Sequence, residues 1–339
     1  MAKHNAANER LKHDYLQYLK EAKGRNEASL DAVAKALARF EDSTGRKAFK
    51  TFHREQALAF KRRLAEQLNA RTGQKLSKAT LASTMRELRT FFSWLAGQPG
   101  FKKCIRYSDA DYFNLSEKDL TIARATRPKR VPTLEQMHKV LDAMPTDTVL
   151  EKRNRALVAM AMLTGARGNA LASFKLRHVD LVKGMVFQDG RDVRTKRSKT
   201  FPTYFCPVGG NALTILTEWT AHLRDLETWG PDDPLFPATA IGVGEGGGFV
   251  ATGLARFGWC GTQPIRDIFR NACQAAEQPY FNPHTVRDML AQLGERLCVS
   301  AEAFKAWSQN IGHSDVLTTF TSYGAVPEHR QAELIRTVG

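Results

Sequence analysis

Six residues in the second half of the chain have side chains that bind phosphate or transfer protons. They are Arg167 in TGAR, Lys196 in TKRSK, His284 and Arg287 in HTVR, His313 in GHSD and Tyr323 in SYG. Arginine guanidinium groups stay charged and match the nonbridging oxygens of a phosphate. A tyrosine hydroxyl can form a covalent phosphodiester, and lysine or histidine can give a proton to a leaving 5′-hydroxyl. This set suits transesterification of a DNA backbone without a metal ion.

Each of these residues, taken alone, has a simpler structural interpretation. Arg167 would be a cation at a helix end, His284 and Arg287 a surface pair, His313 a loop or cap residue, and Tyr323 a half-buried aromatic. The lysines would be solvated turn residues. Only the order and spacing of the whole set favour chemistry.

The elements that must position these residues can be predicted from the sequence. Residues 154–181 have the pattern of a buried helix, a glycine-containing turn and another helix, and this turn carries Arg167. Residues 184–208 contain β-branched and aromatic residues around turns, which predicts two or three short strands with the lysines near one turn. The pattern is helical again from Pro264 to the end. In that region Thr318 and Thr319 are expected to start or stabilise the helix that presents Tyr323.

Other segments carry weaker signals. Residues 241–253, IGVGEGGGFVATG, are predicted to be a glycine-rich loop, and they lack the lysine context of a phosphate-binding P-loop. The five cysteines are scattered and form no CxxC pair, which suggests neither a zinc knuckle nor a disulfide framework. No cofactor and no metal site are expected. No run of eighteen apolar residues and no apolar N-terminal signal are present, which favours a protein that stays in the cytoplasm.

The N-terminal region is predicted to be a small helical bundle over residues 8–98. Apolar residues recur at helical spacing over 28–45, with Ser29 or Asp31 as a cap, and again over 54–70 and 77–97. Residues 121–132, TIARATRPKRVP, are basic and lack apolar periodicity, which is typical of a linker. A new helix is then expected, with Thr133 as its cap and Gln136 at the capping-box position.

The positive charge of the chain is concentrated in this N-terminal region. Residues 1–130 contain 28 basic and 14 acidic residues, a net charge of +14. Residues 131–339 contain 22 basic and 21 acidic residues, a net charge of +1. A segment so biased attracts a polyanion, and nucleic acid is the commonest one. The basic side chains on or between the predicted helices are Lys61, Arg62, Arg63, Arg71, Lys75, Lys78, Arg86 and Arg89.

The order Arg, Lys in a strand turn, HxxR, GH and Tyr resembles the tyrosine recombinase, or phage integrase, family. The matching stretches are TGAR, HTVR and IGHSDVLTTFTSYG. The resemblance implies a mainly α fold with a small β-sheet (α+β). It implies a helical core-binding domain over 1–120, a basic linker over 121–132, and a mixed α/β catalytic domain with a C-terminal tail over 133–339.

The resemblance also implies a role for each site residue. Arg167 and Arg287 would clamp the scissile phosphate, and Tyr323 would be the nucleophile that leaves a 3′-phosphotyrosyl link and a free 5′-hydroxyl. Lys196 would be the general acid. His284 would assist proton transfer from Tyr323, and His313 would hydrogen-bond the phosphate. The family acts on double-stranded DNA as a homo-oligomer, typically a tetramer, and accessory DNA-bending proteins can take part.

The sequence departs from the family pattern at three points. Ala170 stands where a glutamate is usual, and Asp288 stands where a histidine often follows the second arginine. The spacing from His313 to Tyr323 is ten residues, one more than is common. Lys199 competes with Lys196 for the role of general acid, and Lys196 is preferred because it lies nearer the predicted turn.

Three functions are compatible with these features. The favoured one is a site-specific recombinase of the integrase type, whose tail, residues 325–339, packs on a neighbouring protomer or on its own. A type IB topoisomerase shares the covalent chemistry, but the compact size and the basic helical N-terminal region favour the recombinase. The third is a non-catalytic DNA-binding regulator, against which the intact set of catalytic groups argues.

Overall fold

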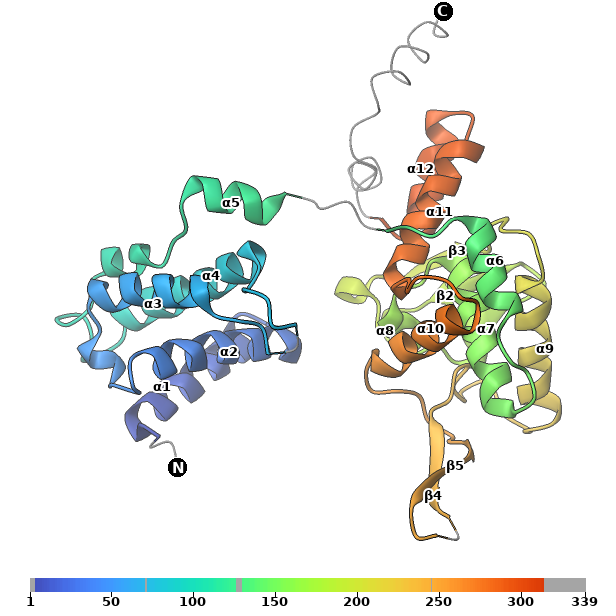
Figure 1. Cartoon of the computed structure of the whole chain (residues 1–339), viewed down its shortest axis with the longest axis horizontal. Helices are drawn as coiled ribbons and strands as arrows, with labels where there is room; N and C mark the ends of the chain where they lie inside the picture. The colour runs from blue at the N-terminus through green and yellow to red at the C-terminus, as the bar shows by residue number, and fades with distance from the viewer. Residues whose placement is uncertain (1–3, 71, 126–129, 245, 314–339) are drawn as a thin grey trace, which may run out of the picture. The chain divides into compact units, whose positions relative to one another are not determined.

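The computed structural model describes residues 4–70, 72–125, 130–244 and 246–313, and Figure 1 gives the arrangement of the elements. The chain divides into two compact units, Met1–Arg127 and Pro128–Gly339. The first is helical and the second combines helices with two small sheets, so the predicted mainly α class with a small β-sheet is confirmed. None of the described helices is long and apolar enough to cross a bilayer.

Within its described residues, the N-terminal unit has five α-helices joined by short helical turns. Their bounds are α1 (Ala6–Gln17), which continues as a π-helical turn (Tyr18–Ala22), α2 (Glu27–Ser43), α3 (Arg54–Glu66), α4 (Lys78–Ala96) and α5 (Glu117–Arg124). Short 3₁₀ turns span Phe49–Thr51 and Tyr107–Tyr112. The apolar stripes of α2, α3 and α4 meet in one core whose centre is aromatic. Phe40 packs edge-to-face against Phe60 and Phe92 with ring centroids 5.4 and 5.2 Å apart, a favoured geometry for aromatic pairs.

The helix ends of this unit partly follow the predictions. Ser77 caps α4 at the start of the range predicted to be helical, because its hydroxyl accepts a hydrogen bond from the Thr80 amide. The predicted cap of α2 was wrong, since Asn26 holds that position and accepts from the Ser29 amide. The proposed linker over 121–132 also starts too early, because residues 121–124 form the last turn of α5.

Some basic residues of the N-terminal unit are paired with acids. Lys75, Lys78 and Arg89 lie 2.6–2.7 Å from the carboxylates of Glu66, Asp119 and Asp111. Exposed pairs of this kind contribute little to stability, so they can separate when a polyanion competes for the cations.

The second unit packs its helices around the buried helix α7. Its helices are α6 (Leu134–Asp142), α7 (Val149–Thr164), α8 (Gly168–Leu171), α9 (Ala212–Asp225), α10 (Gln263–Ala275), α11 (Pro283–Leu297) and α12 (Ala301–Asn310). Side chains from Ala156 to Leu163 are all buried, and α7 packs against α9 and α11. Thr133 and Gln136 form the predicted capping box at the start of α6, with hydrogen bonds of 3.1 and 2.9 Å.

A three-stranded antiparallel sheet lies beside these helices. The strands β1 (Val179–Asp180), β2 (Met185–Gln188) and β3 (Phe201–Tyr204) lie in sequence order, and Val186 pairs with Thr203. These are the short strands predicted within 184–208, with β1 in addition. The β2–β3 connection contains the basic run TKRSK, which includes the 3₁₀ turn Lys196–Ser198.

The predicted glycine-rich loop over 241–253 is wrong. Strands β4 (Thr239–Val243) and β5 (Phe249–Leu254) pair there as an antiparallel hairpin, which projects from the rest of its unit in Figure 1. The physical reason lies in the residues on either side of the glycines. Ile241 and Val243 precede them and Phe249 and Val250 follow, so β-branched and aromatic residues flank a turn.

Candidate active site

Arg167 follows α7, a helix whose side chains from Ala156 to Thr164 are all buried. Gly165 ends α7 in the left-handed conformation with φ of 58°, which reverses the chain after Thr164. A side chain at Gly165 would meet Leu290 at 3.0 Å and would also be strained, so this close approach of α7 and α11 requires glycine. Arg167 then forms the N-terminal cap position of α8, and burial lowers the pKa of its guanidinium.

Arg287 reaches the same place from α11. Its side chain is buried, its Nη1 donates to the Gly165 carbonyl at 3.1 Å, and its Nε donates to His313 Nε2 at 3.2 Å. Within the described part of the chain, its Nη2 is buried and has no hydrogen-bond partner. A buried donor left unpaired is costly, so this nitrogen is well suited to an anionic ligand.

The two guanidinium groups repel each other. Burial, and then the positive charge of Arg167, lower the pKa of Arg287 to about 9, while Asp288 opposes the shift. An anion placed between Arg167 and Arg287 would relieve this repulsion.

His313 is brought to Arg287 by the end of α12. Asn310 fixes that end to β3, because its side chain accepts from the Tyr204 amide at 2.7 Å and donates to the Tyr204 carbonyl at 2.9 Å. Gly312 then turns the chain with φ of 71°, and a Cβ there would lie 2.5 Å from the Phe201 ring. The glycine of the GH pair is therefore required by the turn and by the ring that it passes.

Several cations surround His313. Burial lowers the pKa of His313 to about 4, and the charges of Arg287, Arg167, His284 and Lys196 act in the same direction. The imidazole is consequently neutral at neutral pH, which leaves it able to donate one proton in a hydrogen bond.

This shift predicts a pH dependence of folding stability. The pKa of His313 is lower in the folded chain than the ordinary value of 6.5, so its contribution is complete above pH 6.5 and is lost as the pH falls towards 4. Because the imidazole is only half-buried and solvent screens part of the shift, the size of the effect is on the order of 1–2 kcal/mol. Urea unfolding of the wild type and of His313→Gln between pH 7 and pH 4 measures it. The wild type should lose more stability than the variant, and equal losses would contradict the assigned shift.

Lys196 and Lys199 line a small cleft together with Arg167 and His313. The cleft, with a volume of about 110 Å³, is lined by Arg167, Lys196, Arg197, Lys199, Phe201, Gly312 and His313. Both lysines are exposed, and the charge of Lys196 acts on His313. Arg197 was not predicted as a site residue, although it lies in the same TKRSK run. Its left-handed φ of 61° belongs to the tight turn of this loop.

His284 lies one turn before Arg287 on α11. It is exposed, and its backbone amide donates to the side chain of Asn282, which caps the helix. The structure therefore brings five of the six predicted residues together: Arg167, Lys196, His284, Arg287 and His313. Tyr323, Thr318 and Thr319 lie outside the described residues. Among the described residues, no three His, Cys, Asp or Glu side chains group as ligands for a metal ion.

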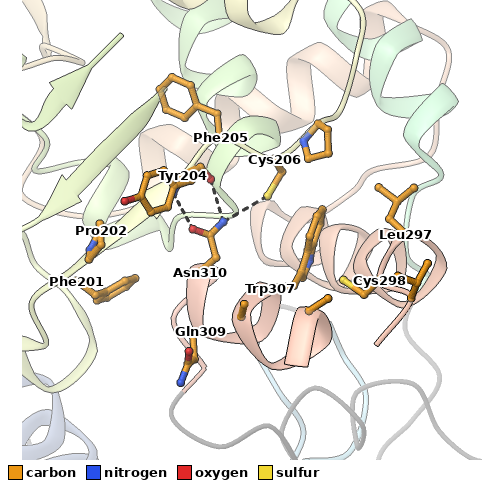
Figure 2. A pocket seen from close by; sticks show the side chains of 14 residues that line it. Phe201, Pro202, Tyr204, Phe205, Cys206, Leu297, Cys298, Trp307, Gln309 and Asn310 are labelled. Carbon is orange, nitrogen blue, oxygen red and sulfur yellow. Dashed lines mark hydrogen bonds between the residues drawn. The ribbon is translucent and has the colours of Figure 1, made fainter. Parts of the chain in front are cut away.

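A larger apolar pocket on the other side of β3 was not predicted. It has a volume of about 730 Å³ and is lined by residues of β3, by the end of α11 and by α12, as Figure 2 shows. Trp307 closes one wall, and its indole donates to the Leu290 carbonyl at 2.9 Å. No sequence pattern could reveal this pocket, because three separate segments form it.

Sequence comparisons find relatives of this chain. A sequence model of the phage integrase family matches residues 130–329. Tyrosine recombinase XerC of Escherichia coli O1:K1 / APEC is 25% identical over 246 residues, which cover 72% of this chain and 69% of that protein.

Solved structures share the fold. The Tn1549 transposon integrase in complex with a circular intermediate DNA has a TM-score of 0.63 at 15% identity, over 97% of this chain and 99% of that chain. A lambda integrase dimer bound to a COC′ core site has a TM-score of 0.58 at 13% identity, and the match covers 94% of this chain and 97% of that chain. The chain belongs to the phage integrase family, the tyrosine-type site-specific recombinases that cleave and rejoin DNA.

Proposed function

We propose that this chain recombines double-stranded DNA at a specific site through a covalent 3′-phosphotyrosyl intermediate on Tyr323, without a metal ion or cofactor. The observation that carries the proposal is the cleft in which Arg167, Lys196 and His313 meet, with Arg287 bonded to His313. Two guanidinium groups with a free donor nitrogen match a phosphodiester, and a neutral imidazole can donate to one of its oxygens. In this proposal the protein acts in the cytoplasm on its DNA substrate.

Each group then has a role in a single strand-cleavage step. The Tyr323 oxygen attacks the phosphorus and loses its proton with the help of His284. Arg167 and Arg287 neutralise the negative charge on the nonbridging oxygens, and His313 hydrogen-bonds one of them. The bond from phosphorus to the 5′-oxygen breaks, and Lys196 gives that oxygen a proton. Attack by a 5′-hydroxyl from a second duplex reverses the step and rejoins the strands.

A plasmid assay separates this function from that of a type IB topoisomerase. A binding site is first selected from random duplex DNA, and supercoiled plasmids with and without two copies of it are incubated with the protein in EDTA. Recombinant products are expected only from the plasmid that carries the sites. Relaxation of both plasmids at equal rates, without recombinants, would support the topoisomerase instead.

We also propose that the protein assembles on DNA as a tetramer in which the tail, residues 325–339, exchanges between protomers. The apolar pocket of Figure 2 is the proposed acceptor, because it lies near the end of α12, after which the chain continues to the tail. Val299 in its wall is 99% exposed, so this apolar side chain remains available for another segment. Accessory DNA-bending proteins can add to such an assembly by bringing two sites together.

The Val299→Asp variant tests the exchange. A charge in an apolar interface is costly, so the variant should weaken assembly on DNA by about tenfold or more while single protomers still bind. The matched control is Val182→Asp, since Val182 is also 99% exposed but lies in the turn between β1 and β2. Native mass spectrometry of the DNA complexes gives the number of bound protomers. Unchanged assembly with a less stable protomer would indicate that the tail packs on its own chain.

A further inference from the structure

The loop that carries Lys196 has a specific anchor two residues earlier in the chain. We infer that Arg194 is the positioning residue for Lys196, and that it couples the general acid to the segment that follows Arg167. This inference rests on the proposed function, in which Lys196 protonates the leaving oxygen.

The guanidinium of Arg194 is bound entirely by backbone carbonyl groups. Its Nη1 donates to the Cys260 carbonyl at 2.5 Å, and its Nη2 donates to the carbonyls of Trp259 at 2.5 Å and Ala172 at 3.2 Å. The Arg194 amide also donates to the Ser173 hydroxyl at 2.9 Å. A planar fork of five donors can satisfy several acceptors at once, which an ammonium group cannot do with the same geometry.

These acceptors connect Lys196 to the other side of the cleft. Ala172 is the C-terminal cap of α8, whose N-terminal cap position is Arg167. Trp259 and Cys260 come shortly before α10, whose N-cap is Thr262. Thr262 packs closely against Gly168 in α8, since a Cβ at this glycine would lie 3.1 Å from the Thr262 side chain. Arg194 therefore ties the β2–β3 loop to the same short segment that presents Arg167.

The remainder of the loop has a constrained backbone but an exposed tip. Val193 is buried in the core on one side of Arg194, and the Thr195 hydroxyl donates to the Lys199 carbonyl at 2.7 Å on the other. Arg197 and Ser198 both have positive φ, with values of 61° and 51°.

Lys196 itself is exposed, so no buried side-chain packing fixes its position. The Thr195 bond stays within the loop, whereas the hydrogen bonds of Arg194 attach the loop to other segments and can hold Lys196 at the cleft.

The inference can be tested because the proton transfer can be bypassed chemically. Ordinary DNA releases a 5′-oxygen that needs a proton when the phosphorus–oxygen bond breaks. DNA with sulfur at that bridging position releases a thiolate instead, and thiols have a pKa of about 8.5, so protonation is not needed at neutral pH. A variant that has lost only the placement of the acid should therefore cleave the sulfur-containing DNA normally.

The experiment compares cleavage rates on both substrates for Arg194→Ala, Arg194→Lys and the control Arg191→Ala in the full chain. Arg191 belongs to the same loop, but the acidic side chain that it pairs with among the described residues is that of its neighbour Asp189, at 2.6 Å. We expect Arg194→Ala to cleave ordinary DNA at least about tenfold more slowly, and sulfur-containing DNA at the wild-type rate. Arg194→Lys should behave like the alanine variant, because it keeps the charge and loses the fork. Arg191→Ala should not change either rate.

Three results would overturn the inference. Equal slowing on both substrates would mean that Arg194 contacts the phosphate or supports the fold. Rescue by Arg194→Lys would mean that only its charge matters for DNA attraction. Normal cleavage by Arg194→Ala would mean that the loop needs no anchor. Lys196→Ala, measured in parallel, separates the role of Lys196 as general acid from the role of Arg194 as its positioning residue. If Lys196→Ala also cleaves the sulfur-containing DNA slowly, the assignment of Lys196 as general acid fails, whatever the result for Arg194.

Discussion

Tyr323→Phe should form no covalent complex with DNA and should still bind the same duplex. The variant lacks only the phenolic oxygen, which in the proposed step becomes esterified to the phosphate, so the expected loss is complete rather than partial. The measurement is a denaturing gel of protein incubated with a nicked duplex, whose short cleaved fragment diffuses away and leaves any adduct trapped. Binding is measured on the same duplex by gel shift.

A matched tyrosine variant controls for general effects of this substitution. Tyr280→Phe removes a hydroxyl from an exposed ring in the same unit, which packs against Arg270. It should leave the adduct unchanged. An adduct that persists in Tyr323→Phe would assign the nucleophile to another residue.

Arg287→Met should lower the rate of strand cleavage by about 10³-fold and should leave the free energy of unfolding unchanged or raise it. The rate falls because one donor pair to the phosphate oxygens is lost, and single donors of this kind are worth about 10²–10³ in rate. Stability is preserved because Arg287 is a buried cation whose pKa is lowered to about 9 by burial and by Arg167. Methionine has a similar length and carries no charge, so the substitution removes the free-energy cost of burying a cation, although the hydrogen bond to the Gly165 carbonyl is lost.

The same substitution elsewhere on α11 gives the control. Arg296 lies in the last turn of that helix and is exposed, so Arg296→Met should change neither cleavage nor stability much. Single-turnover cleavage and urea unfolding of both variants provide the two measurements. A large loss of stability in Arg287→Met would show that this arginine mainly supports the fold, and normal cleavage would remove it from the site.

The sequence predicted the elements around the site well where local signals were strong. Thr133 and Gln136 form the capping box at the start of α6, and the helix before Gly165 is as buried as its apolar run implied. Three of the five predicted site residues that meet stand at the ends of elements: Arg167 after α7, Lys196 between β2 and β3, and His313 after α12. The other two, His284 and Arg287, lie in the first turns of α11. A residue at such an end is easy to place once the element is recognised.

Features that depend on tertiary contacts could not be predicted. Gly312 is needed because the Phe201 ring lies 2.5 Å from where a Cβ would be, and Phe201 is more than a hundred residues away in the chain. The apolar pocket near α12 and the carbonyl acceptors of Arg194 come from segments that share no sequence pattern. The β4–β5 hairpin was missed for a local reason, since its many glycines outweighed the β-branched residues on either side.

The most direct test of the account identifies the residue that becomes attached to DNA. Wild-type protein is incubated in EDTA with the nicked duplex, the trapped complex is digested with protease, and the peptide carrying nucleotides is sequenced by mass spectrometry. We expect a peptide that contains Tyr323, joined through its side-chain oxygen to a 3′-phosphate, with a free 5′-hydroxyl on the released strand. Attachment at another residue, attachment to a 5′-phosphate, or binding of the duplex without any adduct would contradict it.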